Sequence, residues 1–238
     1  MRLGIMQPYF LPYLGYFSLI AATDRFVIFD PVQYIRHGWI NRNRVLKPDF
    51  EQPQYIQIPL VKHARQTRIR DIKISGQSDC KARIIRQIQH YKQRAPYFEQ
   101  AREILQECLQ LETESLVALN VHCLVTICRA LDLEFNPTLF DELPQTIQPA
   151  PQAGEWAVQI SAALGASVYI NPTGGRDIFR PQQFTDCGIE LQFLENSLVA
   201  YPQKNRQFVA GLSILDVLMF NSLAETRRQI DSFTTCAA

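Results

Sequence analysis

The sequence lacks most of the features that mark a specialised class of protein. It has almost no net charge, with 24 lysines and arginines against 23 aspartates and glutamates, so the overall balance gives no reason to expect nucleic acid or an anionic membrane as a partner. No apolar stretch approaches the ~20 residues that a membrane-spanning helix needs. The chain starts directly in a strand-like apolar run, without a secretory leader. These features predict a cytoplasmic protein with no membrane span.

Metal-binding and nucleophile motifs are also missing. The six cysteines form no CxxC pair, so we predict reduced structural thiols. The four histidines are dispersed and lack paired acidic partners, so we predict no metal site. The chain contains no GxxxxGK[ST] loop, no GxGxxG fingerprint and no GxSxG elbow. A P-loop, a dinucleotide fingerprint and a hydrolase triad are therefore unsupported.

The chain does have an ordinary globular composition and a clear strand–helix–strand pattern at its start. Hydrophobic residues make up 47% and charged residues 20% of the sequence, as in typical soluble domains. Leu3–Met6 and Arg25–Phe29 read as short buried strands, and Tyr13–Ala22 between them has helical spacing. A strand, helix and strand within thirty residues predict a βαβ unit with parallel strands.

The remaining chain divides into a helical middle and a C-terminal part that mixes strands and helices. Alternating apolar and polar residues predict strands over Gln54–Leu60 and Arg68–Ile74. Helical periodicity predicts three helices that begin near Asp79, Pro96 and Thr113. Further helices and strands are predicted at Glu155–Leu164, Ser167–Ile170, Ile189–Leu194, Leu212–Asn221 and Glu225–Ile230.

Together these elements predict an α/β fold. We expect a parallel-containing, Rossmann-like sheet with flanking helices, plus a helical insertion or subdomain. The sheet domain would comprise residues 1–78 and 152–238, and the helical subdomain residues 79–134. The proline-rich segment 135–151 is predicted to be a linker.

Two runs near the start are candidate halves of one site. Gly4–Phe17 contains two prolines and five aromatic residues, and Asp30–Arg44 gathers amides, guanidiniums, an imidazole and an indole. Gln7 and Asp30 follow the two predicted strands, and open α/β sheets bind ligands beyond the carboxyl ends of their strands. We therefore expect the two runs to face each other across one crevice, with Gln7 and Arg42 on the same side of the molecule.

The second run offers groups for recognition and for proton transfer. Arg36 and Arg42 present planar forks that suit phosphate or carboxylate, Trp39 offers a face for packing on a ring, and His37 is a candidate general base near Asp30. The predicted catalytic residues are His37 and Asp30, and the predicted substrate-binding residues are Gln7, Tyr13, Gln33, Arg36, Trp39, Asn41, Arg42, Asn43, Arg176 and Gln203. The alternative for the second run is a solvated edge strand.

Two further segments have two interpretations each, and a third repeats the chemistry of the first run. Arg176 follows a glycine pair that either lets backbone approach a ligand or only makes a turn. The basic segment Lys62–Arg70 is either a solvated face or a contact for a phosphate or an anionic acceptor. Gln203 closes a Tyr-Pro-Gln sequence that repeats the aromatic, proline and amide chemistry of the first run.

These motifs resemble those of the WbqC-like protein family, over nearly the whole chain. The anchors are MQPYFLPYLGYF (Met6–Phe17), DRFVIFDPVQYIRHGWINRNR (Asp24–Arg44), YINPTGG (Tyr169–Gly175), the stretch around Phe184 and Gly188-Ile189, and LSILD (Leu212–Asp216). Pro31 stands where the family commonly has a second acidic residue. Members occur in bacterial gene clusters for surface polysaccharides such as O-antigen, and a role in transferring glycine or an acyl group to an amino sugar has been suggested.

The resemblance implies a transferase or ligase that attaches an acyl or aminoacyl group to an amino sugar or a related small molecule. Amide formation needs an activated donor, so ATP with magnesium or acyl-CoA are the candidate cofactors. The expected substrate is a nucleotide-sugar or an amino sugar. The alternatives are a non-catalytic protein that binds a nucleotide-sugar or glycan intermediate, and a transferase that contacts tRNA, against which the near-neutral charge argues.

Overall fold

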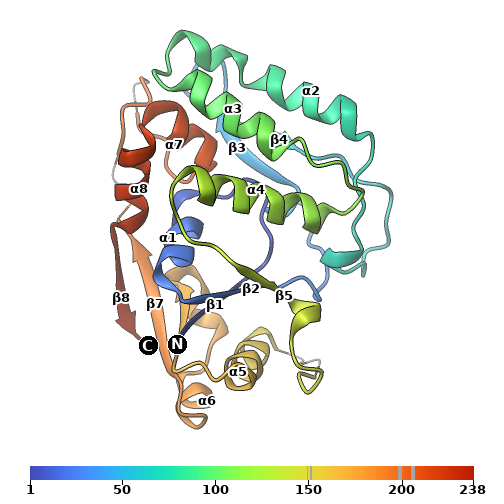
Figure 1. Cartoon of the computed structure of the whole chain (residues 1–238), viewed down its shortest axis with the longest axis vertical. Coiled ribbons are helices and arrows are strands. Elements are labelled where there is room, and N and C mark those ends of the chain that lie inside the picture. Colours follow the sequence, from blue (N-terminus) through green and yellow to red (C-terminus); the bar gives the residue numbers. More distant parts are fainter. Residues whose placement is uncertain (149, 151, 198–199, 205–206) are drawn as a thin grey trace.

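A six-stranded sheet forms the centre of the molecule. The computed structural model describes residues 1–148, 150, 152–197, 200–204 and 207–238. The strands of the central sheet are β1 Arg2–Met6, β2 Arg25–Ile28, β5 Pro137–Leu139, β6 Val168–Pro172, β7 Glu190–Asn196 and β8 Phe233–Ala237. Their order is β5-β2-β1-β6-β7-β8, with β8 antiparallel and the other neighbours parallel (Figure 1). This mostly parallel sheet confirms the predicted α/β, Rossmann-like class.

The predicted βαβ unit is present at the start of the chain. Helix α1, Leu14–Ala22, connects β1 to β2, and these strands pair in parallel from Leu3–Arg25 to Met6–Ile28. The ladder ends there because Pro8, two residues after β1, has no backbone N–H to donate. Almost every residue of α1 is buried, as expected for a helix that is apolar on all sides.

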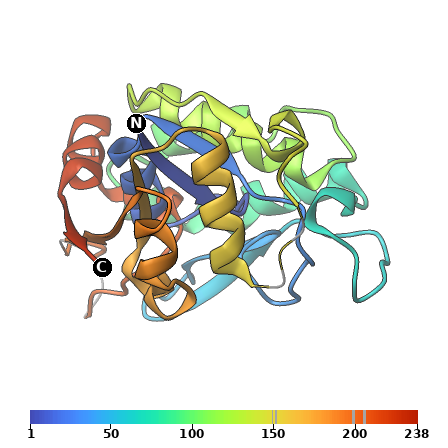
Figure 2. The same ribbon diagram turned by 90° about the horizontal axis from the view of Figure 1, so that it is seen from below.

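Helices cover both faces of the sheet (Figures 1 and 2). They are α2 Gln77–Gln87, α3 Phe98–Cys108, α4 Leu116–Ala130, α5 Ala153–Ala163, α6 Pro181–Thr185, α7 Ile214–Phe220 and α8 Leu223–Asp231. Side chains alternate across a strand, so Phe26 and Ile28 of β2 enter a large core with α1 to α4, α7 and α8. Val27 enters a smaller core on the other face with α5 and α6.

In the described residues, an antiparallel hairpin and four short 3-10 helices complete the structure. The hairpin pairs β3 Arg42–Leu46 with β4 Pro53–Gln57 and belongs to a separate two-stranded sheet. The 3-10 helices are η1 Ile69–Asp71, η2 Gln89–Gln93, η3 Phe140–Glu142 and η4 Thr173–Ile178. The hairpin contributes Val45, Leu46 and Ile56 to the large core, so it is anchored to the helical layer and not to the central sheet.

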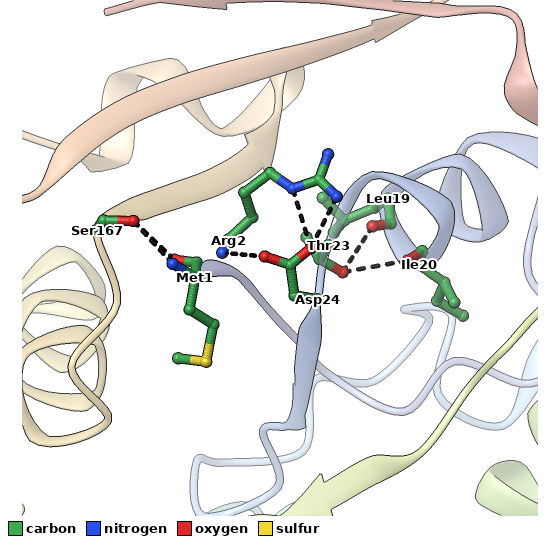
Figure 3. A network of polar contacts seen from close by, with 7 residues as sticks. All are labelled: Met1, Arg2, Leu19, Ile20, Thr23, Asp24 and Ser167. Atoms are coloured by element: carbon green, nitrogen blue, oxygen red, sulfur yellow. Dashed lines mark hydrogen bonds and ion pairs between the residues drawn. The ribbon is translucent and has the colours of Figure 1, made fainter.

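Polar contacts fasten the amino-terminal edge of the sheet (Figure 3). The Asp24 carboxylate accepts hydrogen bonds from the backbone N–H of Arg2 at 2.7 Å and from its guanidinium at 2.7 and 3.1 Å. The amino group of Met1 donates to Ser167 Oγ at 2.8 Å. These contacts join the ends of β1, β2 and β6, but their exposure limits each to less than about 1 kcal/mol.

The structure differs from the predicted elements in three places. Residues 68–74 form η1 and isolated bridges instead of a strand. Ile69, Ile72 and Ile74 are all buried in the large core, but Ile69 and Ile72 are three residues apart, as one turn of a 3-10 helix requires and a strand does not. The predicted linker contains β5 and η3, and residues 149 and 151 of it lie outside the described residues. Strand β8 has no predicted counterpart, because its exposed residues show no buried face to pattern.

Candidate functional site

A cavity of about 500 Å³ lies at the carboxyl ends of β2, β1 and β6. We call it the aromatic cavity. Its aromatic lining residues are Tyr9, Tyr13, Phe29, Trp39, Trp156, Tyr169 and Phe179, and its amide side chains are Gln7, Asn43 and Asn171. The described lining residues include no aspartate, glutamate, lysine, arginine or histidine. A neutral chamber with flat walls and a few amides suits a neutral, polar ring.

The end of β6 shapes one wall of the aromatic cavity. Asn171 is buried and accepts a hydrogen bond from Tyr169 Oη at 3.2 Å, while its Nδ2 donates to the carbonyl of Pro172 at 3.0 Å. A Cβ on Gly175 would lie 2.2 Å from Asn171 Nδ2. Glycine is therefore required here because the Asn171 amide occupies the space that a side chain would fill.

A buried asparagine of α4 joins the two runs that the sequence predicts to face each other. Asn120 Nδ2 donates to the carbonyls of Pro8 and Ile40, each at 2.7 Å. Two further hydrogen bonds connect the same two runs. Phe10 N–H donates to the Trp39 carbonyl at 3.0 Å, and Asn43 Nδ2 donates to the Phe10 carbonyl at 3.1 Å. The turn after β1 and the segment before β3 therefore lie side by side, and both contribute residues to the aromatic cavity.

The tyrosines of the aromatic cavity are neutral hydrogen-bonding groups. Burial raises the pKa of Tyr9, and burial followed by the proximity of Tyr9 raises the pKa of Tyr13. Both hydroxyls therefore keep their protons at neutral pH and can donate hydrogen bonds to a ligand oxygen. With Gln7 they form a set of neutral donors on the side of the cavity next to β1 and α1.

A second depression, of about 920 Å³, adjoins the aromatic cavity and shares Gln7 and Phe29 with it. We call it the basic hollow. Its remaining lining residues are Val32, Gln33, Tyr34, Ile35, Arg36, His63 and Arg65. No aspartate or glutamate belongs to this described lining, so the basic hollow is positively charged where the aromatic cavity is neutral.

The lining of a third, smaller depression of about 330 Å³ includes Arg36, His37, Asn41 and Arg42. Arg42 does not line the aromatic cavity with Gln7. Its guanidinium donates to the carbonyls of His37 and Gly38 and packs 4.1 Å from the centre of the Tyr55 ring. The turn carbonyls satisfy the donors of Arg42 locally, so the expected pairing of Arg42 and Gln7 across one crevice is absent.

The Asn41 side chain, in the same region, makes hydrogen bonds within the protein. It is buried, accepts a hydrogen bond from Tyr34 Oη at 2.8 Å and donates to the Ile58 carbonyl at 2.9 Å. His37 is exposed and has a φ of 65°, in the left-handed region that few residues other than glycine adopt.

Three other predicted residues line none of these depressions. The carboxylate of Asp30 forms an ion pair with Arg70 at 2.6 Å, and burial raises its pKa although Arg70 acts against that shift. Arg176 donates to Cys236 Sγ at 2.8 Å on β8. Gln203 is buried and donates to Asp216 Oδ1 at 3.0 Å.

The structure also assigns positions to residues that the sequence did not single out. His63 lines both the basic hollow and the third depression. Its Nδ1 lies 2.9 Å from the Val61 carbonyl, and because a carbonyl only accepts, Nδ1 carries the proton and Nε2 of the neutral ring is the acceptor. Trp156 and Asn120 gave no local signal, since a tryptophan and an asparagine within apolar helical patterns are compatible with ordinary packing.

Neither a metal cluster nor a membrane span emerges from the described part of the chain. Within it, no group of three or more histidine, cysteine, aspartate or glutamate side chains is placed to hold a metal ion. None of its helices combines the length and the apolar character that crossing a membrane requires.

The chain is an α/β protein with a cavity at the carboxyl edge of a mostly parallel sheet. Residues 7–228 match the family model of the WbqC-like protein family, and the chain belongs to this family. It is 28% identical over 226 residues to the uncharacterized protein Rv1507c of Mycobacterium tuberculosis (strain ATCC 25618 / H37Rv), with 94% of this chain and 95% of that protein covered. No solved structure shows a significant match to the chain.

Proposed function

We propose that the protein is a transferase or ligase that attaches an acyl or aminoacyl group, such as glycine, to the amino group of a sugar used in surface-polysaccharide synthesis. The aromatic cavity carries this proposal. Sugars bind to proteins through CH faces that pack on aromatic rings and hydroxyls that bond to amides, and the cavity offers both without a fixed charge.

The same cavity has the donors that acyl transfer requires. The sugar nitrogen forms a bond to the acyl carbon, the carbonyl oxygen becomes negatively charged, and the leaving group of the donor departs with the bonding electron pair. Tyr9, Tyr13 and Gln7 are neutral donors in the cavity, and preorganised donors of this kind stabilise such an oxyanion.

The amine must also lose a proton. We assign this step to His63, which lines the hollow that shares Gln7 with the cavity. Its Nε2 is buried and has no hydrogen-bond partner among the described residues, so the ring has to move for this atom to reach the amine. His37, which lines the third depression together with Arg36, stays an alternative base. Asp30 is less suited, because its ion pair with Arg70 occupies the carboxylate.

Turnover tests the proposal. The purified protein is incubated with UDP-linked amino sugars and with glycine and ATP·Mg, glycyl-tRNA or acetyl-CoA in turn, and mass spectrometry follows the added acyl mass. We expect one donor to give product, Trp39→Ala to abolish it through lost ring packing, and His63→Gln to lower kcat by about 10²-fold or more with KM little changed.

Two exposed aromatic side chains allow a matched control. Tyr55 is 44% exposed and Trp39 36% exposed, but Tyr55 does not line the aromatic cavity. Tyr55→Ala should leave turnover within about twofold of the wild type, because it removes an aromatic ring without touching the cavity. Product formation that survives Trp39→Ala would contradict the assignment of the cavity.

The alternative is a binding protein for a nucleotide-sugar or glycan intermediate. The described lining residues of the aromatic cavity include no carboxylate, imidazole or amine, and this favours the alternative, since binding needs no proton transfer. Tight sugar binding with no product from any donor would select this alternative.

A further inference from the structure

We infer that the sugar reaches this protein as a diphosphate ester, with the diphosphate held in the basic hollow by Arg36 and Arg65 and the sugar in the aromatic cavity. This inference rests on the proposed function and names its substrate class. Its starting point is geometric: the two depressions share Gln7 and Phe29, so one elongated ligand can occupy both.

The size of the combined site exceeds that of a free sugar. The aromatic cavity of about 500 Å³ is sufficient for a single ring with its substituents, and ligand pockets of this size normally enclose most of their ligand. The basic hollow, which shares Gln7 with the cavity, adds about 920 Å³. A ligand that fills only the cavity would leave the charged half of the site without a partner.

The arginines of the basic hollow have no acidic partner. In the described chain, neither Arg36 nor Arg65 forms an ion pair, whereas Arg68 pairs with Asp71 at 2.9 Å and Arg70 with Asp30 at 2.6 Å. The nearby carboxylates are thus committed to other arginines. Arg36 and Arg65 are exposed and keep their guanidinium forks open to an anion.

Backbone pairing brings the two arginines to the same hollow. Gln33 and Arg68 form an antiparallel bridge, and Tyr34 N–H donates to the Thr67 carbonyl at 2.9 Å. Arg36 and Arg65 stand in the turns beyond this isolated bridge, and both line the basic hollow. Two cations that share one hollow repel each other, and a bound anion removes that repulsion.

A diphosphate fits these groups better than a carboxylate or a monophosphate. Each guanidinium binds one phosphoryl group in a bidentate manner, so two arginines match two adjacent phosphates. Diphosphate sugars exist with two kinds of carrier, a nucleoside or a polyprenyl lipid, and both carry the chemistry that the hollow recognises.

Isothermal titration with defined probes tests the inference. The probes are UDP-N-acetylglucosamine, UDP, geranyl diphosphate and the neutral methyl glycoside of N-acetylglucosamine, each against the wild type, Arg36→Gln, Arg65→Gln and the double variant. We expect each single substitution to weaken UDP-N-acetylglucosamine about tenfold and the methyl glycoside less than twofold. Because the arginines are exposed, the weakening should shrink as salt is added.

Arg86 supplies the matched control. It is an exposed arginine on α2 that lines neither depression, so Arg86→Gln should leave all four affinities unchanged. Binding of UDP with the same arginine dependence would indicate a nucleoside carrier, and binding of geranyl diphosphate without UDP would indicate a lipid carrier. Equal affinity of the double variant and the wild type for every diphosphate would overturn the inference.

Turnover separates this inference from the proposed function. If the double variant acylates a free amino sugar at the wild-type rate and diphosphates bind without arginine dependence, the diphosphate subsite is wrong and the transferase stands. If UDP-N-acetylglucosamine binds with the expected arginine dependence but no donor yields product, the subsite stands and the transferase does not.

Discussion

Burial of the Asp216 carboxylate costs free energy, and the hydrogen bonds that it accepts offset only part of that cost. Its side chain is fully buried and accepts hydrogen bonds from Tyr91 Oη at 2.6 Å, Tyr201 Oη at 2.7 Å and Gln203 Nε2 at 3.0 Å. Burial raises its pKa to about 6, with the three hydrogen bonds acting in the opposite direction. The desolvation of the carboxylate therefore outweighs the donors.

This pKa predicts how stability changes with pH. The ordinary value is 3.8 and the folded value about 6, so between these values the folded state binds more protons than the unfolded state, and the free energy of unfolding falls as pH rises. We expect the wild type to lose about 2 kcal/mol relative to Asp216→Asn between pH 4 and pH 7, measured by urea denaturation at each pH. A wild type that gains stability relative to the variant over this range would contradict the assignment.

Some of the predicted site residues have side chains that face a cavity, and others have side chains that hydrogen-bond within the protein. Gln7, Tyr13 and Trp39 line the aromatic cavity, and their roles in binding stay predictions until ligands are measured. Asn43 lines the same cavity, but its amide already bonds to the backbone of Phe10 and Arg44. Gln203 was singled out for an amide that the structure uses inside the Asp216 network. A residue type indicates what a side chain can bond to, but its partner depends on neighbours that are distant in sequence.

At the scale of elements, α4 holds the site together through one side chain. Asn120 donates to Pro8 in the turn after β1 and to Ile40 in the segment before β3. Both runs that the sequence predicts to meet are thereby attached to a helix that begins more than seventy residues later in the chain. The helix thus fixes the distance between the two sides of the aromatic cavity.

We expect Asn120→Ala to lower the free energy of unfolding by about 2–4 kcal/mol, because two buried carbonyls lose their donor. It should also weaken UDP-N-acetylglucosamine about tenfold or more by loosening the cavity wall. Thermal or urea denaturation and calorimetric titration measure the two effects.

Thr126, on the same helix, provides the comparison. It is equally buried, and its hydroxyl has no hydrogen-bond partner in the described structure. Thr126→Val should therefore change the free energy of unfolding by less than about 1 kcal/mol and leave ligand affinity as it is. Equal losses in the two variants would mean that general packing on α4, and not the Asn120 bonds, holds the site.

At the scale of the whole molecule, the large core crosses the predicted boundary between sheet domain and helical subdomain. It contains Phe17 and Ile28 from the sheet side and Leu105 and Leu124 from the predicted helical subdomain. A core shared in this way makes each side depend on the other for burial of its apolar surface.

We therefore expect one cooperative unfolding transition. The two tryptophans report on different regions: Trp39 precedes the hairpin and Trp156 lies on α5. Trp39→Phe and Trp156→Phe leave one fluorescent probe each, and both urea midpoints should coincide with that of far-ultraviolet circular dichroism. A transition in far-ultraviolet circular dichroism at lower urea than both fluorescence transitions would show that residues 79–134 unfold as a separate unit.

Local patterns were sufficient for most of the fold. The apolar runs of β1, β2, β6 and β7 and the helical periodicity of α3 and α4 are visible because burial on one or both faces leaves a period in the sequence. The sequence does not predict β8 or η1, because neither has the burial pattern of its own type of element. The exposed residues of β8 leave no period, and the isoleucines of η1 and its flank imitate an alternation.

The βαβ start, the mostly parallel sheet and the place of Gln7 at a strand end can all be predicted from the sequence, because they follow from local burial and from the handedness of short connections. No local pattern predicts that Trp39 lines the aromatic cavity while Arg42 bonds to the carbonyls of its own turn. Hydrogen-bonding groups take the partner that folding brings within about 3 Å, and contacts such as that between Asn120 and Pro8 join residues far apart in the chain, where no local pattern records them.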